Sequence, residues 1–157
     1  MKILLLGKNG QVGWELQRSL SPLGEIIALD RHGLNEWCGD LTQPEKIYQT
    51  ILDISPDVVV NASAYTAVDL AEADTETANL VNHLAVGKIA EACLKVKALL
   101  IHYSTDYVFN GDGQTSFSED NTIEPLNVYG QTKALGEQVI VASKCDHLIF
   151  RTSWVFA

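Results

Sequence analysis

The sequence predicts a single α/β domain built on a doubly wound parallel sheet. Short apolar runs alternate with longer segments of helical periodicity, and a glycine-rich turn directly follows the first apolar run. At 157 residues, the chain has room for one continuous core. Because crossovers between parallel strands are right-handed, this alternation leaves few topologies, and the doubly wound nucleotide-binding fold is the commonest of them.

Each element is predicted from its own pattern. Five apolar runs bounded by polar or turn residues predict short buried strands at residues 3–6, 26–29, 58–60, 99–101 and 148–150. The segments between them have the period of an α-helix and predict crossover helices at residues 12–20, 44–54, 75–97 and 125–142. Residues 110–124 lack periodicity and are rich in Gly, Asp, Ser and Thr, so we expect a long loop of the kind that often carries function.

The composition narrows the classes of function. Hydrophobic residues make up 46% and charged residues 20%, which excludes disordered, collagen-like and disulfide-scaffold proteins. The 11 Lys and Arg against 20 Asp and Glu give a formal net charge of -9, which opposes binding to nucleic acid or to an anionic membrane. The cysteines, Cys38, Cys93 and Cys145, are widely spaced, and no apolar stretch has the length of a signal peptide or a membrane span. We therefore expect a soluble cytoplasmic protein.

Gly7, Gly10 and Gly13 form a G-x-x-G-x-x-G turn between the first strand and the first helix. Glycines at such a turn permit a tight bend, close approach of the backbone to a pyrophosphate, and packing of the helix on the strand, while the helix N-terminus supplies N–H donors. The spacing differs from the G-x-G-x-x-G of many dehydrogenases, and a turn that serves only the backbone is the alternative. The position between strand and helix favours dinucleotide binding.

Asp30 ends the second strand, 17 positions beyond Gly13 (30 − 13). A carboxylate at this place commonly accepts hydrogen bonds from the adenosine ribose, which favours NAD over NADP. Arg31 follows directly, and a guanidinium beside the ribose is a partner for the 2′-phosphate of NADP. The sequence therefore leaves the choice between NADH and NADPH open.

Tyr129 and Lys133 stand four residues apart, on one face of a predicted helix. An unperturbed phenol titrates near pH ~10, and a nearby cation lowers its pKa toward the range in which it transfers protons at neutral pH. Alone, such a pair is usually a solvated helix face. Here it follows a strand that ends at residues 102–106, where hydroxyls such as that of Thr105 emerge at the ligand-binding edge of the sheet. Together these groups predict a site for carbonyl reduction.

Four strings of sequence carry a family resemblance. They are residues 61–66 (NASAYT), 102–109 (HYSTDYVF), 125–130 (PLNVYG) and 151–155 (RTSWV). With the glycine turn and the Tyr–Lys pair, the chain resembles the extended short-chain dehydrogenase/reductases, and among them the reductases of nucleotide sugars. The resemblance runs along the whole chain but covers about the first half of a family member. It implies a Rossmann-like NAD(P)-binding domain over residues 1–157, with the substrate-binding part absent, and the chain, which stops just after its last strand, looks cut.

The resemblance also implies a set of cofactor contacts. They extend from the adenosine to the nicotinamide and are assigned to Gly7, Gly10, Gln11, Val12, Gly13, Asp30, Asp40, Leu41, Ala64, Tyr65, Thr66, Tyr103, Tyr129 and Lys133. Within this set, Asp40 and Leu41 are expected at the adenine and Tyr103 on the nicotinamide side. The implied cofactor is NADPH or NADH.

The catalytic assignments come from the same resemblance. Tyr129 is expected to donate a proton to the developing alkoxide, while Lys133 holds the nicotinamide ribose and lowers the pKa of the phenol. Thr105 is expected to bind the carbonyl oxygen or to tune the phenol, and Thr105, Asp106 and Trp154 are expected to contact the sugar nucleotide. The implied reaction is reduction of the C4 ketone of a dTDP-deoxysugar.

Related branches differ at these positions. Sugar-nucleotide dehydratases use a Thr-Asp-Glu run, and Tyr107 here takes the place of the Glu. Epimerases often carry small residues where this chain has Asp106 and Tyr107. A non-catalytic, NADP-binding regulatory subunit of the same fold is a further alternative, although the presence of Tyr129, Lys133 and Thr105 together argues for an enzyme. Another nucleotide-sugar reductase or epimerase also stays an alternative.

No metal ligand is predicted. The histidines show no metal-ligand spacing. Glu15 resembles a family position associated with Mg²⁺ at a subunit contact, but a helical glutamate is far more often a solvated charge. The resemblance allows a homodimer, and neither nucleic acid nor a membrane is expected as a partner.

Overall fold

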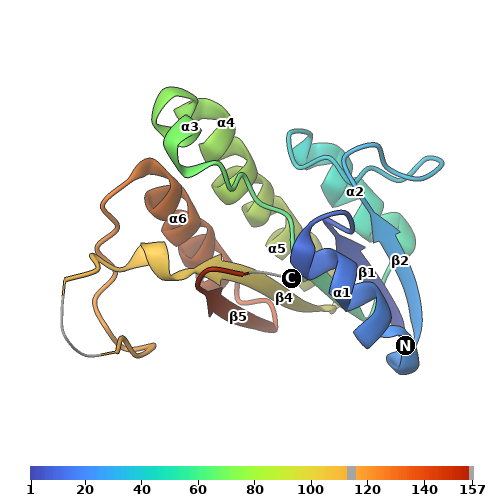
Figure 1. Ribbon diagram of the computed structural model, residues 1–157. Helices are drawn as coiled ribbons and strands as arrows, with labels where there is room; N and C mark the ends of the chain where they lie inside the picture. The colour runs from blue at the N-terminus through green and yellow to red at the C-terminus, as the bar shows by residue number, and fades with distance from the viewer. Residues whose placement is uncertain (113–115, 156–157) are drawn as a thin grey trace.

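The predicted parallel sheet is present in the computed structural model, which describes residues 1–112 and 116–155. Its strands lie in the order β2-β1-β3-β4-β5, and all neighbours are parallel (Figure 1). The strands are β1 (Lys2–Leu6), β2 (Glu25–Leu29), β3 (Val58–Asn61), β4 (Leu99–Thr105) and β5 (His147–Thr152). The predicted fold class and all five predicted strands are confirmed, and β4 continues to Thr105 instead of ending at residue 101.

Helices cover both faces of this sheet. The α-helices are α1 (Gln11–Ser19), α2 (Pro44–Ile54), α3 (Val68–Ala73), α4 (Thr75–Asn79), α5 (Ala85–Val96) and α6 (Val128–Ser143). Shorter turns are the 3-10 turns η1 (Ser21–Leu23) and η3 (Asp106–Val108) and the π turn η2 (Leu80–Leu84). Among the described residues, no helix combines the length and the apolar character needed to cross a bilayer.

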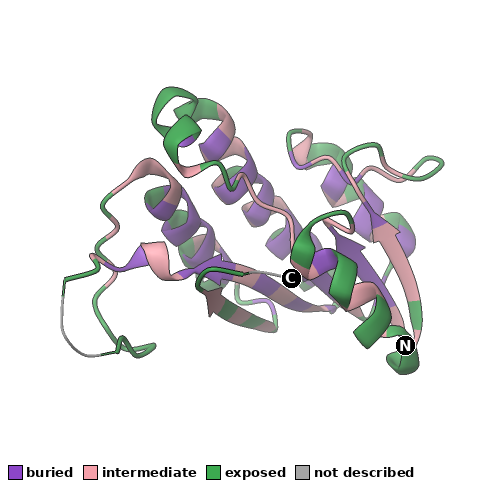
Figure 2. Ribbon diagram, viewed as in Figure 1, coloured by how far each residue is buried: buried purple, intermediate pink, exposed green. Residues whose placement is uncertain are grey.

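Strand β1 supplies both halves of the core. Leu4 and Leu6 face the cluster formed with α2 and α5, whereas Ile3 and Leu5 face the opposite side, where α1 packs. All four side chains are buried, and Figure 2 shows β1 mostly in the colour of buried residues. Because β1 is covered on both faces, its apolar run is continuous instead of alternating.

The strand order reverses between β1 and β3. Strand β2 pairs with one edge of β1 and β3 with the other, and Leu6 is in register with both Leu29 and Asn61. In doubly wound sheets, ligands bind in the crevice outside the carboxyl ends of the strands at such a switch point. The segments that follow β1, β2 and β3 therefore meet where a ligand is expected.

The segment 75–97, predicted as one helix, is helical but not uniform. It contains the π turn Leu80–Leu84, in which the N–H of Ala85 bonds to the carbonyl of Leu80, and it is preceded by the unpredicted α3. A π turn inserts one extra residue and re-aims the side chains around it, which is why such turns are frequent at functional sites. Here the turn carries Asn82.

Helix α6 begins at Val128, three residues later than predicted. The side chain of Asn127 is the physical reason, because its Oδ1 accepts a hydrogen bond from the backbone N–H of Gly130 at 2.7 Å and caps the helix. The predicted long loop before this helix is present over its described part, and residues 113–115 of it lie outside the described residues.

Two helical glycines give opposite predictions for stability. A Cβ at Gly13 would lie 2.0 Å from the carbonyl oxygen of Gly7, which is backbone and cannot yield cheaply. We expect Gly13→Ala to lower the free energy of unfolding by about 1–3 kcal/mol. At Gly87 the nearest atom is a side-chain carbon of Val139 at 3.7 Å, so Gly87→Ala is expected to raise that free energy by about 0.5–1 kcal/mol. Urea unfolding measures both, and equal effects would contradict the close approach.

Candidate active site

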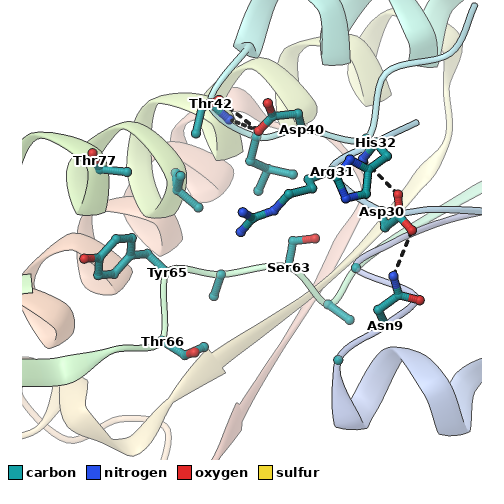
Figure 3. A pocket seen from close by; sticks show the side chains of 17 residues that line it. Asn9, Asp30, Arg31, His32, Asp40, Thr42, Ser63, Tyr65, Thr66 and Thr77 are labelled. Atoms are coloured by element: carbon teal, nitrogen blue, oxygen red, sulfur yellow. Dashed lines mark hydrogen bonds between the residues drawn. The ribbon is translucent and has the colours of Figure 1, made fainter. Parts of the chain in front are cut away.

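Two adjoining cavities follow the carboxyl edge of the sheet. The first, of about 670 Å³, lies beyond the ends of β1, β2 and β3 and is drawn in Figure 3. The second, of about 510 Å³, lies beside the N-terminus of α1, the end of β4 and the start of α6. The two share the lining residues Gly10, Ala62, Ser63, Ala64 and Thr66. They form one groove across the switch point, with volumes typical of ligand sites.

Most of the residues predicted for the site line this groove. The first cavity holds Gly7, Gly10, Asp30, Asp40, Leu41, Ala64, Tyr65 and Thr66. The second holds Gly10, Gln11, Val12, Ala64, Thr66, Tyr103, Thr105, Asp106, Tyr129, Lys133 and Trp154. Gly13 is the exception, because it is buried under the turn and does not line either cavity.

The three glycines of the turn have different functions. Gly7 has a φ of +88°, and a Cβ there would lie 2.7 Å from Ser63 Oγ, so only glycine fits between β1 and the segment after β3. Gly13 lets α1 approach the turn, as described above. Gly10 has an ordinary φ of −77°, and a Cβ there would meet nothing closer than 3.5 Å. It caps α1 beside the groove, where the first N–H groups of the helix are available to an anion.

Asp30 lies at the end of β2 within a dense set of donors. Its Oδ1 accepts from the backbone N–H of His32 and its Oδ2 from Asn9 Nδ2, both at 2.8 Å, and Lys8 Nζ lies 3.6 Å from Oδ2. The hydrogen bond from His32 is the main reason that the pKa of Asp30 is lowered. Figure 3 shows the neighbouring Arg31 side chain reaching into the pocket. A carboxylate and two cations thus stand together at the predicted ribose site.

Asp40 and Leu41 form the far wall of the first cavity. The Asp40 carboxylate accepts from Thr42 N, Thr42 Oγ1 and Gln43 Nε2 at 2.8–3.0 Å. Burial raises the pKa of Asp40, but these bonds outweigh it and the net shift is downward. Asp40 therefore shapes the turn that leads into α2, while Leu41 presents an apolar surface.

Asn82 was not predicted from the sequence and holds the segment predicted to pass along the cofactor. Its Oδ1 accepts from Tyr65 N at 2.8 Å, and its Nδ2 donates to Tyr65 O at 3.1 Å and to Thr132 Oγ1 at 3.2 Å. The π turn directs this amide inward, where it is 1% exposed. The available sequence signal was weak, because Asn82 stands beside His83 and only three residues after Asn79.

Tyr129 lies in the first turn of α6, close to the end of β4. Gly130 allows this approach, because a Cβ there would lie 2.2 Å from Tyr107 O. The rings of Tyr107 and Tyr129 pack edge to face, 5.6 Å apart. Burial raises the pKa of Tyr129, and the neighbouring hydroxyl of Thr105 opposes that rise. The net shift in the chain alone is therefore upward, not downward as expected from the neighbouring Lys133.

Lys133 lies one turn further along α6 and is buried, with 1% exposure. Its Nζ donates to Tyr103 O at 2.7 Å and lies 3.2 Å from His102 Nε2. Burial lowers the pKa of Lys133 to about 8, although Glu137 opposes this. The amine is thus turned toward β4 and not toward the phenol, which explains why the predicted lowering of the Tyr129 pKa is not seen.

An ion pair was also not predicted from the sequence: it joins Glu137 on α6, which is buried, to Arg151 on β5, which is half-buried. Glu137 is 4% exposed and accepts from Arg151 Nη2 at 2.6 Å, from Arg151 Nε at 3.0 Å and from Ser104 Oγ. These bonds tie α6 to β4 and β5 and hold the start of α6 against the strand ends. Glu137 continues the face of Tyr129 and Lys133 by one more turn, which was the available sequence signal.

The predicted substrate residues lie at the outer end of the second cavity. Thr105 Oγ1 donates to Asp106 Oδ1 at 3.2 Å, and Asp106 Oδ2 accepts from Ser153 Oγ at 2.6 Å. Trp154 lines the same cavity but is 82% exposed. An exposed indole beside polar groups offers a surface on which a planar ring can stack.

Glu15 does not resemble a metal site. It pairs with Arg18 on the same helix, and within the part of the chain that the structure describes no three His, Cys, Asp or Glu side chains are grouped to hold a metal ion. The described residues therefore give no support to the Mg²⁺ that the family resemblance raised.

Comparisons with family models and with curated proteins point to the same family. The family model described as the RmlD substrate binding domain matches residues 1–157. The dTDP-4-dehydrorhamnose reductase of Shigella flexneri is 55% identical over 157 residues, which are 100% of this chain and 52% of that protein. The chain thus spans about half the length of the curated relatives that it matches.

Solved structures agree in fold. A dTDP-4-dehydrorhamnose reductase from Clostridium acetobutylicum superimposes with a TM-score of 0.92 at 34% identity, over 99% of this chain and 54% of that one. The same enzyme from Bacillus anthracis, in complex with NADP, has a TM-score of 0.91 at 34% identity, with the same coverage of 99% and 54%.

Proposed function

Because the chain belongs to the family of the RmlD substrate binding domain, we propose that it is the NAD(P)H-binding half of a dTDP-4-dehydrorhamnose reductase. The proposed reaction reduces the C4 ketone of dTDP-4-dehydro-L-rhamnose to give dTDP-L-rhamnose, a precursor of cell-surface polysaccharide such as O-antigen. The observation that carries the proposal is the single groove that joins the glycine turn to Thr105, Tyr129 and Lys133.

The residues of the groove fit a nicotinamide dinucleotide. The turn leaves free space at Gly10 beside a helix N-terminus, which suits a pyrophosphate. Asp30 offers a carboxylate to a ribose, and Leu41 offers an apolar contact to an adenine. When bound, the reduced nicotinamide supplies the hydride. The NADP-bound relative from Bacillus anthracis supports this assignment.

The chain's own groups supply the proton and the orientation. Tyr129 is the group placed to protonate the alkoxide oxygen that forms at C4, since burial keeps its phenol protonated at neutral pH. Thr105 lines the same cavity and lowers the pKa of this phenol, and Lys133 reaches the cavity to hold a ribose. Asp106 and Trp154 form the wall proposed for the sugar nucleotide, whose other wall belongs to the rest of the enzyme.

A binding-only role is the weaker alternative. A regulatory subunit that merely binds NADP has no need for a phenol and an amine in one cavity, yet Tyr129 and Lys133 both line it. We place the enzyme in the cytoplasm, where its cofactor and its free cysteines are stable. A homodimer is compatible with the resemblance, whereas Mg²⁺ is not part of the proposal because Glu15 does not fit it.

The direct test uses a chain extended to the full length of the relatives. Loss of NADPH or NADH absorbance in the presence of dTDP-4-dehydro-L-rhamnose measures the reaction, and dTDP-L-rhamnose is the expected product. Binding of either cofactor without any turnover would favour the regulatory subunit. No binding of either cofactor would refute the proposal.

Asp30→Ala is expected to shift cofactor preference toward NADPH. The lowered pKa keeps this carboxylate charged at neutral pH, so it repels a 2′-phosphate. Its removal frees Lys8 to pair with that phosphate beside Arg31. We expect the ratio of the two Kd values to change by about 10-fold in favour of NADPH. Fluorescence titration measures both constants. Asp53→Ala, which removes the same charge from α2, is the control, and an equal shift there would contradict the assignment.

A further inference from the structure

Three buried polar side chains form a line that ends at the proposed catalytic lysine, Lys133. Asn61 ends β3, His102 lies on the neighbouring β4, and Lys133 enters from α6; all three are at most 1% exposed. Asn61 Nδ2 lies 3.1 Å from His102 Nδ1, and His102 Nε2 lies 3.2 Å from Lys133 Nζ. The mechanism described above uses only the lysine.

The contact between Ser63 and Asn61 determines which groups donate and which accept in the rest of the line. The backbone N–H of Ser63 donates to Asn61 Oδ1 at 3.1 Å, and an N–H group can only donate. The amide therefore turns its Nδ2 toward the imidazole, and His102 Nδ1 must accept. A neutral imidazole that accepts at Nδ1 carries its proton on Nε2, so a donor faces Lys133.

An ammonium at Lys133 conflicts with this arrangement. The group −NH₃⁺ has three donors and no acceptor, so it would face the donor of His102. The uncharged amine has one lone pair, which accepts from His102 Nε2–H, and its own N–H donates to Tyr103 O at 2.7 Å. If the Asn61 amide is reversed, its Nδ2 faces the backbone N–H of Ser63. If His102 carries its proton on Nδ1 instead, that N–H faces Asn61 Nδ2. Either change therefore creates a contact between two donors elsewhere in the line.

We propose that His102, fixed as its Nε2–H tautomer by Asn61, is a positioning residue that favours the uncharged amine of Lys133 and so sets the pH range in which this lysine is charged. Burial keeps the pKa of His102 well below its usual value, so the imidazole stays neutral, and Lys133 adds to this effect.

The other titratable groups near Lys133 lie on α6, β4 and η3. Glu137 on α6 raises the pKa of Lys133, but its carboxylate is already engaged by Arg151 and Ser104. Tyr129 on α6, Tyr103 on β4, and Asp106 and Tyr107 of η3 line the same cavity as the amine. Of the groups that contact Lys133 Nζ within hydrogen-bond distance, the imidazole of His102 is the titratable one.

The consequence for the reaction rests on the proposed function. If the charged lysine holds the ribose, turnover falls as pH rises through its pKa of about 8. A variant that alters the hydrogen bonds between Asn61, His102 and Lys133 shifts the pH at which activity falls on the alkaline side. Loss of a purely structural contact instead lowers activity at every pH.

Nuclear magnetic resonance tests the inference on the 157-residue chain without cofactor or substrate. Imidazole ¹⁵N shifts of the unmodified chain report the tautomer of His102, and Nε2–H is expected. The ¹³Cε signal of Lys133, assigned by its loss in Lys133→Arg, reports the midpoint of its titration, which is expected near pH 8. An Nδ1–H tautomer would overturn the proposal.

Three variants test which groups donate and which accept in this line of hydrogen bonds. In Asn61→Asp, a carboxylate accepts from Nδ1–H, so Nε2 accepts from the ammonium and the Lys133 midpoint is expected to rise by about one pH unit or more. His102→Leu removes the opposing donor and is also expected to raise it. In His102→Gln, the amide accepts from Asn61 and donates to Lys133, so the midpoint is expected to stay near that of the native chain.

Each outcome either supports or overturns the proposed role of His102. If the midpoint is the same in Asn61→Asp, His102→Leu and the native chain, His102 does not act on Lys133. Since Asn61→Asp also adds a charge, its effect is compared with that of the same change in the His102→Leu background, where it must be smaller. If a variant does not fold, the tautomer and the remaining variants decide. A chain that titrates as expected but binds neither NADPH nor NADH would refute the proposed function and leave this inference intact.

Discussion

Tyr129→Phe is expected to lower kcat by about 10²–10⁴-fold in a chain extended to the full length of the relatives. The substitution removes only the phenolic O–H, which is the proposed proton donor and lines the second cavity from the first turn of α6. The ring still packs edge to face on Tyr107, so the fold and the affinity for NADPH should remain. Steady-state kinetics with dTDP-4-dehydro-L-rhamnose measure kcat, and fluorescence titration measures binding of the cofactor.

Tyr107→Phe is the matched control for this variant. It removes a second phenol from the same cavity, 5.6 Å from Tyr129 between ring centres, without removing the proposed donor. We expect its kcat to stay within a few-fold of the native value. A Tyr129→Phe enzyme that turns over at the normal rate would show that another group or water donates the proton, and equal losses in both variants would point to packing instead of proton transfer.

Gly10→Glu is expected to abolish binding of NADPH and NADH. Gly10 caps α1 between the two cavities, and a glutamate there would bring bulk and negative charge to the place proposed for the pyrophosphate. The helix itself should tolerate the change, because an acidic side chain is favourable at a helix N-terminus. Intrinsic tryptophan fluorescence should then show no saturable response up to about 1 mM of either cofactor.

Gly10→Ala separates the effect of the charged side chain from that of losing glycine. The backbone at this position has an ordinary φ of −77°, and an added Cβ would meet nothing closer than 3.5 Å. We therefore expect the alanine variant to fold and to keep most of its affinity. Equal loss of binding in both variants would mean that the position requires glycine for its backbone, and normal binding by Gly10→Glu would remove the pyrophosphate from this turn.

The sequence by itself determined the architecture and most of the groove. Strand β1 lies inside the sheet, between β2 and β3, and is buried on both faces, so its continuous apolar run was a strong signal. The glycine turn and Asp30 directly follow predicted strands, and Tyr129 and Lys133 lie in the first half of a predicted helix. The topology of a parallel sheet directs these positions to one edge. Local pattern and topology together were sufficient for these residues.

Only the tertiary structure decided what supports that groove. Asn82 bonds to Tyr65, 17 residues away, His102 to Asn61, 41 residues away, and Glu137 to Ser104, 33 residues away. A polar side chain at a buried position has no periodic signature that names its partner, because the partner is set by strand order and helix packing and not by neighbouring sequence. For the same reason, the sequence placed Lys133 beside Tyr129, whereas the packed chain turns its amine toward His102 and the carbonyl of Tyr103.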